Sequence, residues 1–102
     1  MQGDVHLNGD ESRDYAPFLL DVQVNLLSDL DTRVVVPLVR ASAFGRPAGR
    51  LHPRFTIDGQ AVVMATHLLA AVRRSTLGDV VASLSEHRDT VIGAIDVLLT
   101  GV

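Results

Sequence analysis

Short apolar segments alternate with turn-forming residues through the first three quarters of this chain, and this spacing restricts the fold more than any other feature. The runs have the length of strands and are bounded by Gly, Pro, Asp or Asn. The expected strands, about five in all, cover Gln2 to Leu7, Phe18 to Leu26, Arg33 to Val39, Arg54 to Ile57 with Gln60 to Thr66, and Leu69 to Arg73. Asp58-Gly59 supplies the positive φ angles that a tight hairpin turn needs. Asn8 to Asp14 and Gly45 to Pro53 are predicted to be loops.

The clearest strand pattern lies in Phe18 to Leu26. Asp21, Gln23 and Asn25 alternate there with apolar residues, which predicts a strand with one face in water. In the next strand Pro37 cannot donate a ladder hydrogen bond, so we expect it at an edge, a bulge or a strand end.

The last quarter of the chain changes to a helical period. Ser83 with Glu86, or Ser85 alone, predicts the N-cap, and Gly101 is placed where a helix stops. The apolar stripe consists of Val91, Ile95, Leu98 and Val102, widened by Ile92 and Leu99. The predicted fold class is α+β and mostly β: a small antiparallel barrel closed by one C-terminal helix.

The length, charge and residue composition of the chain restrict the kinds of function it can have. A chain of 102 residues has room for one domain, and with 47% hydrophobic but only 4% aromatic residues its core must be aliphatic and thin, which favours a dimer. The net charge of −3 does not provide the positive field that nucleic acid binding requires. The absence of cysteine, of a signal sequence and of a membrane span predicts a soluble cytoplasmic protein without a membrane partner.

The sequence as a whole resembles the CcdB toxins of the CcdA–CcdB plasmid-maintenance systems, whose wider relatives include the MazF and Kid ribonucleases. The resemblance runs from end to end and looks ungapped from Leu84 to Val102. Its matches are Met1-Gln2, Val5, Glu11-Ser12-Arg13, Asp21-Val22-Gln23, Val36-Pro37-Leu38, Leu51, Pro53, Ile57, Met64, Thr66, Leu77-Gly78, Val81-Ala82 and Leu84-Ser85.

The resemblance implies a single toxin domain over residues 1–102, with an SH3-like barrel and a C-terminal helix, acting as a homodimer. It also implies the activity: a non-enzymatic inhibitor of a type II topoisomerase, DNA gyrase, whose A subunit it binds and traps on cleaved DNA. A CcdA-like antitoxin with a disordered tail would neutralise it. No catalytic residue, metal or cofactor is expected.

The family's gyrase-binding residues carry over to nine positions. The family's terminal Trp-Gly-Ile corresponds to Thr100-Gly101-Val102, so the aromatic anchor is absent here. Arg88 stands where the family has an acidic residue, and Asp96 where it has Asn. The remaining positions implied by the resemblance are Leu99, Val24, Leu26 and Leu27.

Other polar residues are weaker candidates for chemistry. His6, His52, His67 and His87 are scattered, which indicates surface residues and no metal site. Asp21, Asp29 and Asp31 could form an acid–base group, although Asp is common in turns for its local hydrogen bonds. Arg46, Arg50, Arg54 and Arg73-Arg74 could hold RNA, but the negative total charge favours a solvated face or contact with an acidic antitoxin tail.

Two other functions stay open. A MazF-like mRNA endoribonuclease is the main alternative, because Leu77 to Leu99 resembles that branch as well, whereas Asn8 to Pro17 does not reproduce its Gly-rich, acidic and Arg-Pro signature. The other is a CcdB-like protein that no longer poisons gyrase and acts through antitoxin binding, which the missing tryptophan favours.

Overall fold

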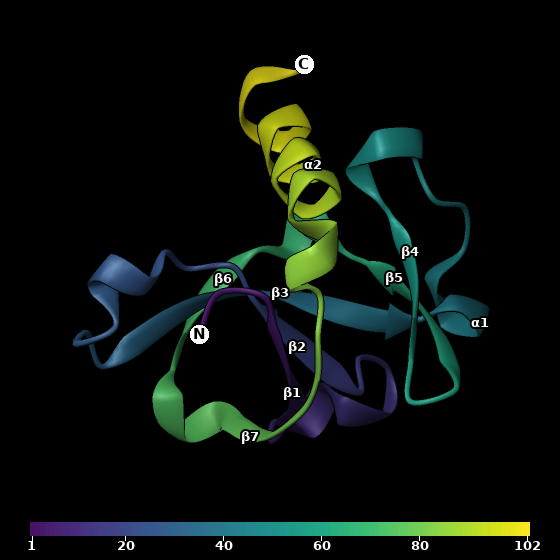
Figure 1. Cartoon of the computed structure of the whole chain (residues 1–102). Helices are drawn as coiled ribbons and strands as arrows, with labels where there is room; N and C mark the ends of the chain where they lie inside the picture. Colours follow the sequence, from purple (N-terminus) through teal and green to yellow (C-terminus); the bar gives the residue numbers. More distant parts are fainter.

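Seven strands form one antiparallel sheet that curls into a half-barrel, and a single long helix ends the chain (Figure 1). The computed structural model describes all 102 residues. The strands are β1 (Asp4–Asn8), β2 (Phe18–Asp21), β3 (Thr32–Arg40), β4 (Arg54–Ile57), β5 (Gln60–Met64), β6 (Ala70–Arg73) and β7 (Leu77–Ser83). The helices are α1 (Ala41–Phe44), α2 (Arg88–Thr100) and the short 3-10 turns η1 (Glu11–Asp14), η2 (Asn25–Leu27), η3 (Gly49–Leu51), η4 (Thr66–Leu68), η5 (Arg74–Thr76) and η6 (Ser85–His87).

The sheet follows the order β4-β5-β3-β2-β1-β7, and β6 pairs with the other end of β3. The fold class predicted from the sequence is therefore confirmed. The predicted hairpin is confirmed too, since Asp58 and Gly59 both have positive φ between β4 and β5. Gly101 is in the left-handed conformation directly after α2, as the helix-stop signal indicated.

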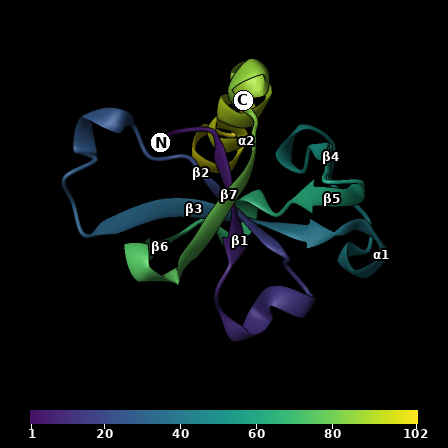
Figure 2. The ribbon, with the colours of Figure 1, turned by 60° about the horizontal axis from the view of Figure 1, so that its bottom comes forward.

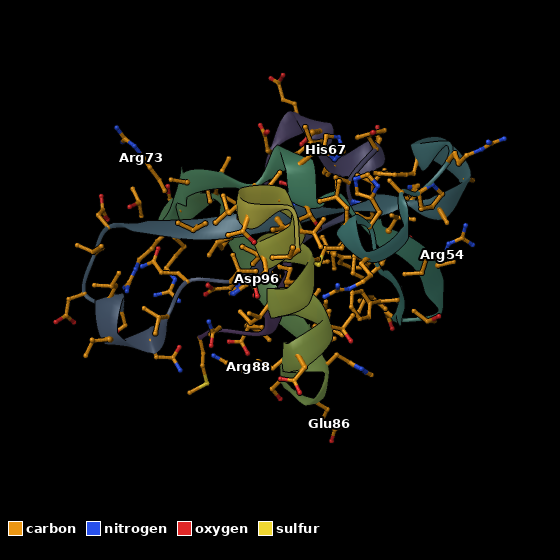
Figure 3. The ribbon with its side chains drawn as sticks, turned by 90° about the horizontal axis from the view of Figure 1, so that it is seen from above. Arg54, His67, Arg73, Glu86, Arg88 and Asp96 are labelled. Atoms are coloured by element: carbon orange, nitrogen blue, oxygen red, sulfur yellow. The ribbon has the colours of Figure 1, made fainter.

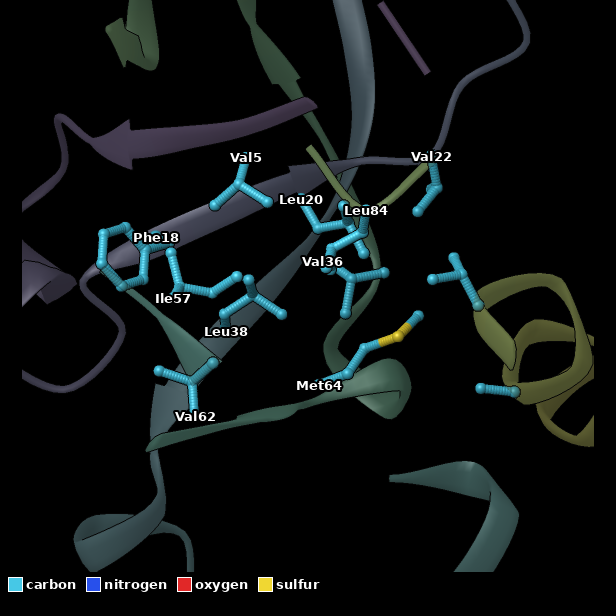
Figure 4. Packing of buried hydrophobic residues seen from close by; sticks show 12 residues of the cluster. Val5, Phe18, Leu20, Val22, Val36, Leu38, Ile57, Val62, Met64 and Leu84 are labelled. Atoms are coloured by element: carbon cyan, nitrogen blue, oxygen red, sulfur yellow. The ribbon is translucent and has the colours of Figure 1, made fainter. Parts of the chain in front are cut away.

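The core lies inside the curve of the sheet and under the first half of α2 (Figure 4). It consists of Val5, Phe18, Leu20, Val22, Val36, Leu38, Ile57, Val62, Met64, Leu84, Val91 and Ala94. Phe18 is the only aromatic side chain among them, so the expectation of an aliphatic core holds. None of the helices is both long enough and apolar enough to span a membrane.

The prediction for the second strand is wrong in two respects. β2 ends at Asp21, well short of Leu26, and the chain then turns into η2. Asp21 and Gln23 are buried, with 1% and 6% of their surface exposed, so they do not form a wet face. The reason is that Arg33 on β3 is buried beside them and supplies the charge and hydrogen bonds that the alternation alone could not reveal.

β7 is a strand that the sequence pattern missed. Its residues are mostly exposed on both faces, which leaves no apolar alternation to read. It forms because the opposite end of the chain, β1, pairs with it. Gly78 allows the close approach, since a Cβ at this position would lie 2.9 Å from the carbonyl oxygen of Leu7.

Pro37 lies inside β3, which has neighbours on both sides and pairs with β2 in regular register there, so the expectation of an edge, a bulge or a strand end is wrong. It occupies the point where β3 changes partner from β6, which pairs up to Val35, to β5, which pairs from Leu38. Its carbonyl accepts a hydrogen bond from the Ala65 amide at 3.0 Å. The missing N–H therefore falls in the gap between the two partner strands of β3.

The start of α2 also differs from the prediction. Neither Ser83 nor Ser85 caps it, because η6 intervenes and α2 begins at Arg88 without a side-chain cap. The Ser83 hydroxyl instead accepts a hydrogen bond from the Ser85 amide at 3.2 Å. The two loops likewise contain ordered turns, η1 and η3, and Asn8 is the buried last residue of β1.

Candidate partner-binding site

A buried ion pair lies where β2 and β3 meet the amino terminus. The Arg33 guanidinium donates from Nε to Asp21 Oδ2 and from Nη2 to Asp21 Oδ1, both at 3.0 Å. The two side chains are 4% and 1% exposed. Such a bidentate pair is held firmly in one geometry, and leaving either charge alone in this environment would be unfavourable.

The pair positions the segment that follows β2. The backbone N–H of Gln23 donates to Asp21 Oδ1, and Arg33 Nη2 donates to the backbone carbonyl of Gln23. The Gln23 side chain then donates to the Leu27 carbonyl at 3.0 Å and accepts from the Val34 amide at 2.9 Å. The side-chain oxygen Oδ1 of Asn25 accepts a hydrogen bond from the backbone N–H of Gln2 at 2.8 Å. The turn η2 is therefore fixed by buried polar groups.

This rigid turn presents apolar side chains to solvent. Leu26 is 89% exposed, and Val24 and Leu27 are about half exposed. Leu30, which the resemblance does not include, is 49% exposed on the same segment. We call these four residues the η2 patch. Ordered apolar side chains held outward by buried polar groups are typical of a surface that a partner covers.

The other candidate residues lie on α2, where Figure 3 labels Arg88 and Asp96, or directly after it, as Gly101 and Val102 do. At its C-terminal end Leu99 and Val102 are 73% and 76% exposed. Thr100 Oγ1 donates to the Asp96 carbonyl at 2.7 Å, and the Gly101 amide donates to the Val97 carbonyl at 3.0 Å. The helix end is thus ordered by its own hydrogen bonds while its side chains face solvent.

The structure does not bring all nine predicted residues together. α2 packs on η3 and η4, and its C-terminal end points away from the sheet, apart from the η2 patch (Figures 1 and 2). Arg88, at the base of α2, lines a small cavity with Gln2 and Val22, next to the start of the patch. One chain therefore carries two exposed sites, the η2 patch and the helix end.

A family model described as "CcdB protein" matches residues 2–101. The chain belongs to the CcdB family. This family comprises toxins of toxin–antitoxin systems, so the identity suggested by the sequence is confirmed at this level.

Two solved structures share the fold of this CcdB-family chain. One is an endoribonuclease in complex with its cognate antitoxin from a mycobacterial species, with a TM-score of 0.77 at 15% identity, covering 97% of this chain and 93% of that one. The other is the Mycobacterium tuberculosis toxin MazF-mt6, with a TM-score of 0.71 at 14% identity, covering 91% and 92% of the two chains. At these identities the likeness is one of fold.

The histidines of this CcdB-family chain are not all surface residues, contrary to the prediction. His52 is 9% exposed, and its ring packs edge-on against Phe44. The Ala48 amide donates to His52 Nδ1, so the proton of the neutral ring is on Nε2, which donates to His67 Nδ1 at 2.9 Å. This pair links the loop around η3 to η4, the two turns that support α2. Sequence spacing did not reveal the pair.

The His52–His67 pair should make stability depend on pH. Burial, and secondarily the neighbouring His67, lower the pKa of His52 below its usual 6.5. Its contribution to the free energy of unfolding is therefore complete above pH 6.5 and is lost as the pH falls through the lowered folded-state pKa. Thermal melting between about pH 7.5 and 5.5 should show a falling melting temperature. His52→Gln should flatten this slope and the exposed-site control His87→Gln should keep it; equal slopes in all three proteins would contradict the assignment.

Proposed function

We propose that this CcdB-family chain is the toxin of a type II toxin–antitoxin system that binds and poisons DNA gyrase in the cytoplasm. Residues 1–102 act as a single toxin domain without a cofactor, and a CcdA-like antitoxin neutralises it. The observation that carries the proposal is the family match over residues 2–101. The helix end supports it, because Leu99 and Val102 are exposed on an ordered terminus.

The proposed gyrase contacts are the helix end and the η2 patch. Thr100, Gly101 and Val102 form the tip, Leu99 and Asp96 lie beside it, and Arg88 lies at the base of the helix. In a homodimer each chain would contribute one copy of both sites. Thr100 in place of an aromatic anchor predicts weaker binding than a tryptophan would give.

We propose binding rather than catalysis because the carboxylates suggested as an acid–base group are either paired or exposed on a loop. Asp21 is paired with Arg33, so it is a poor general base. Asp29 and Asp31 lie on the exposed loop before β3. Asn8 to Pro17 does not reproduce the Gly-rich, acidic and Arg-Pro signature of the ribonucleases.

Two alternatives have their own support. The fold likeness to an endoribonuclease favours RNA cleavage. Thr100, in place of the family's tryptophan, favours a protein that binds antitoxin without poisoning gyrase.

One paired experiment separates the three functions. The purified chain is titrated calorimetrically into the breakage–reunion fragment of gyrase, and induced cells are assayed in parallel for cleaved DNA and cleaved RNA. We expect binding and gyrase-dependent DNA cleavage without RNA cleavage. Metal-independent cleavage of single-stranded RNA by the pure chain would instead support the ribonuclease. A well-folded chain that neither binds the fragment nor cleaves RNA would support the antitoxin-binding alternative.

We also expect a homodimer. β7 ends the sheet with an unpaired edge, and Val80 and Val81 on its two faces are 53% and 38% exposed. An apolar edge of this kind favours association with another chain. Sedimentation at micromolar concentration should give a species of twice the 11.0 kDa chain mass, and Val80→Lys should shift the equilibrium toward the monomer. A wild-type chain found only at 11.0 kDa would overturn the expectation.

A further inference from the structure

A polar pocket of about 500 Å³ lies beside the η2 patch, between that segment and the start of β7. Nine residues line it: Met1, His6, Asp21, Asn25, Ser28, Arg33, Arg74, Leu77 and Gly78. Asn25 and Ser28 belong to the same segment as Leu26 and Leu27, so a partner that covers the η2 patch also reaches the mouth of this pocket.

Arg33 presents an unused donor to this pocket. Its Nε and Nη2 are taken by Asp21 and by the Gln23 carbonyl, whereas Nη1 forms no hydrogen bond within the protein. The side chain is 4% exposed, yet Nη1 is not fully enclosed, because the only fully buried unpartnered side-chain atom belongs to another residue, His6. A guanidinium fixed on one edge by a carboxylate and free on the other is preorganised to bind an acceptor.

His6 is a second residue of the pocket with a polar atom that lacks a hydrogen-bond partner. Its Nδ1–H donates to the Gly78 carbonyl at 2.9 Å, which leaves Nε2 as a buried atom without a partner. A buried polar atom without a partner is unfavourable. Arg74 lines the same pocket, is exposed and forms no ion pair.

We propose that this pocket binds the carboxylate of an acidic side chain, Asp or Glu, on the protein partner that covers the η2 patch. The inference rests on the proposed function insofar as the carboxylate belongs to that partner. A side-chain carboxylate suits the site better than a free phosphate does, because an anion carried by a protein also brings apolar groups to the adjacent η2 patch. The adjacent apolar patch and the net charge of −3 favour a protein over nucleic acid.

The test uses four probes and the full-length chain, with binding followed by the NMR signals of the His6 ring and the Arg33 guanidinium. The probes are acetate, inorganic phosphate and the capped tripeptides Ac-Leu-Glu-Leu-NH2 and Ac-Leu-Gln-Leu-NH2. A charge-assisted hydrogen bond predicts that the Glu peptide binds about tenfold more tightly than the Gln peptide. The Glu peptide should also bind more tightly than acetate, because its leucines contact the η2 patch.

Arg74→Glu and Arg73→Glu form the matched pair of variants. They make the same change of charge at neighbouring exposed positions, but only Arg74 lines the pocket, and Arg73 points outward (Figure 3). We expect Arg74→Glu to remove the preference for the Glu peptide and Arg73→Glu to retain it. Neither variant disturbs the buried pair, so both should fold.

Four results would overturn the inference: equal binding of the two peptides, equal losses in the two variants, acetate binding as tightly as the Glu peptide, or phosphate binding more tightly than acetate. The third would indicate a free small carboxylate and the fourth a phosphate ligand. These titrations contain no gyrase. If the chain prefers the Glu peptide but does not bind gyrase, the carboxylate-binding pocket is supported and gyrase is excluded as the target. If the chain binds gyrase but does not prefer the Glu peptide, gyrase is supported as the target and the carboxylate-binding pocket is excluded.

Discussion

Arg33→Met is expected to lower the free energy of unfolding by about 3–5 kcal/mol, because it leaves the Asp21 carboxylate buried without its partner. For a domain of this size that corresponds to a fall in melting temperature of more than about 10 °C. Chemical denaturation followed by circular dichroism measures the change. The amino-terminal ammonium lies 3.2 Å from Asp21 Oδ2 and would compensate only in part, since Met1 is largely exposed.

The double variant Asp21→Leu/Arg33→Met is the control for this prediction. It removes both charges and replaces them with apolar groups of similar size, so it should recover much of the lost stability. If the double variant were as unstable as the sum of the two single variants, the ion pair would not explain the loss. A single Arg33→Met chain with the stability of the wild type would contradict the prediction outright.

Thr100→Trp is expected to tighten binding to the gyrase fragment by about 2 kcal/mol or more, which is about thirtyfold in the dissociation constant. The side chain at this position is exposed, and its one hydrogen bond, to the Asp96 carbonyl, lies within the same helix. An indole ring there can be buried against a partner without disturbing the core. Calorimetric titration measures the gain, and thermal melting checks that the fold is kept.

Thr56→Trp is the matched control, since it makes the same substitution at an exposed position on β4, away from the helix end. It should leave the affinity unchanged. Deleting Gly101 and Val102 should weaken binding, because it removes the amide that caps the Val97 carbonyl and an exposed apolar side chain. Equal affinities in all four proteins would exclude the helix end as the contact.

Local signals in the sequence predicted the parts of the fold that depend on local chemistry. The Asp58-Gly59 hairpin, the C-terminal helix and the Gly101 stop are each encoded in a few neighbouring residues, and each is present. The predicted apolar stripe holds only in the first half of the helix, since Leu99 and Val102 are largely exposed. The strand β7 and the buried Asp21 depend instead on partners far along the chain, β1 and Arg33. Alternation of apolar and polar residues cannot distinguish a solvated carboxylate from one neutralised by a distant arginine.

The candidate site likewise has a part that the sequence predicted and a part that it did not. The family resemblance pointed to Val24, Leu26, Leu27 and the helix end, and the structure finds most of them exposed. It did not point to the groups that hold the η2 patch in place or to the pocket beside it, because their roles arise from tertiary contacts. An arginine near the start of a strand, followed directly by three valines, was the one available signal that a charge was buried there.

The pairing of β1 with β7 also determines when this protein can be complete during its synthesis. The first strand to leave the ribosome has β2 on one side, and on its other side it must wait for residues 77–83 near the end of the chain. The Leu84 amide then bonds to the Gly3 carbonyl at 2.8 Å and joins the two ends. A chain that stops before residue 77 therefore lacks both the closing strand and the helix that carries part of the proposed gyrase contact.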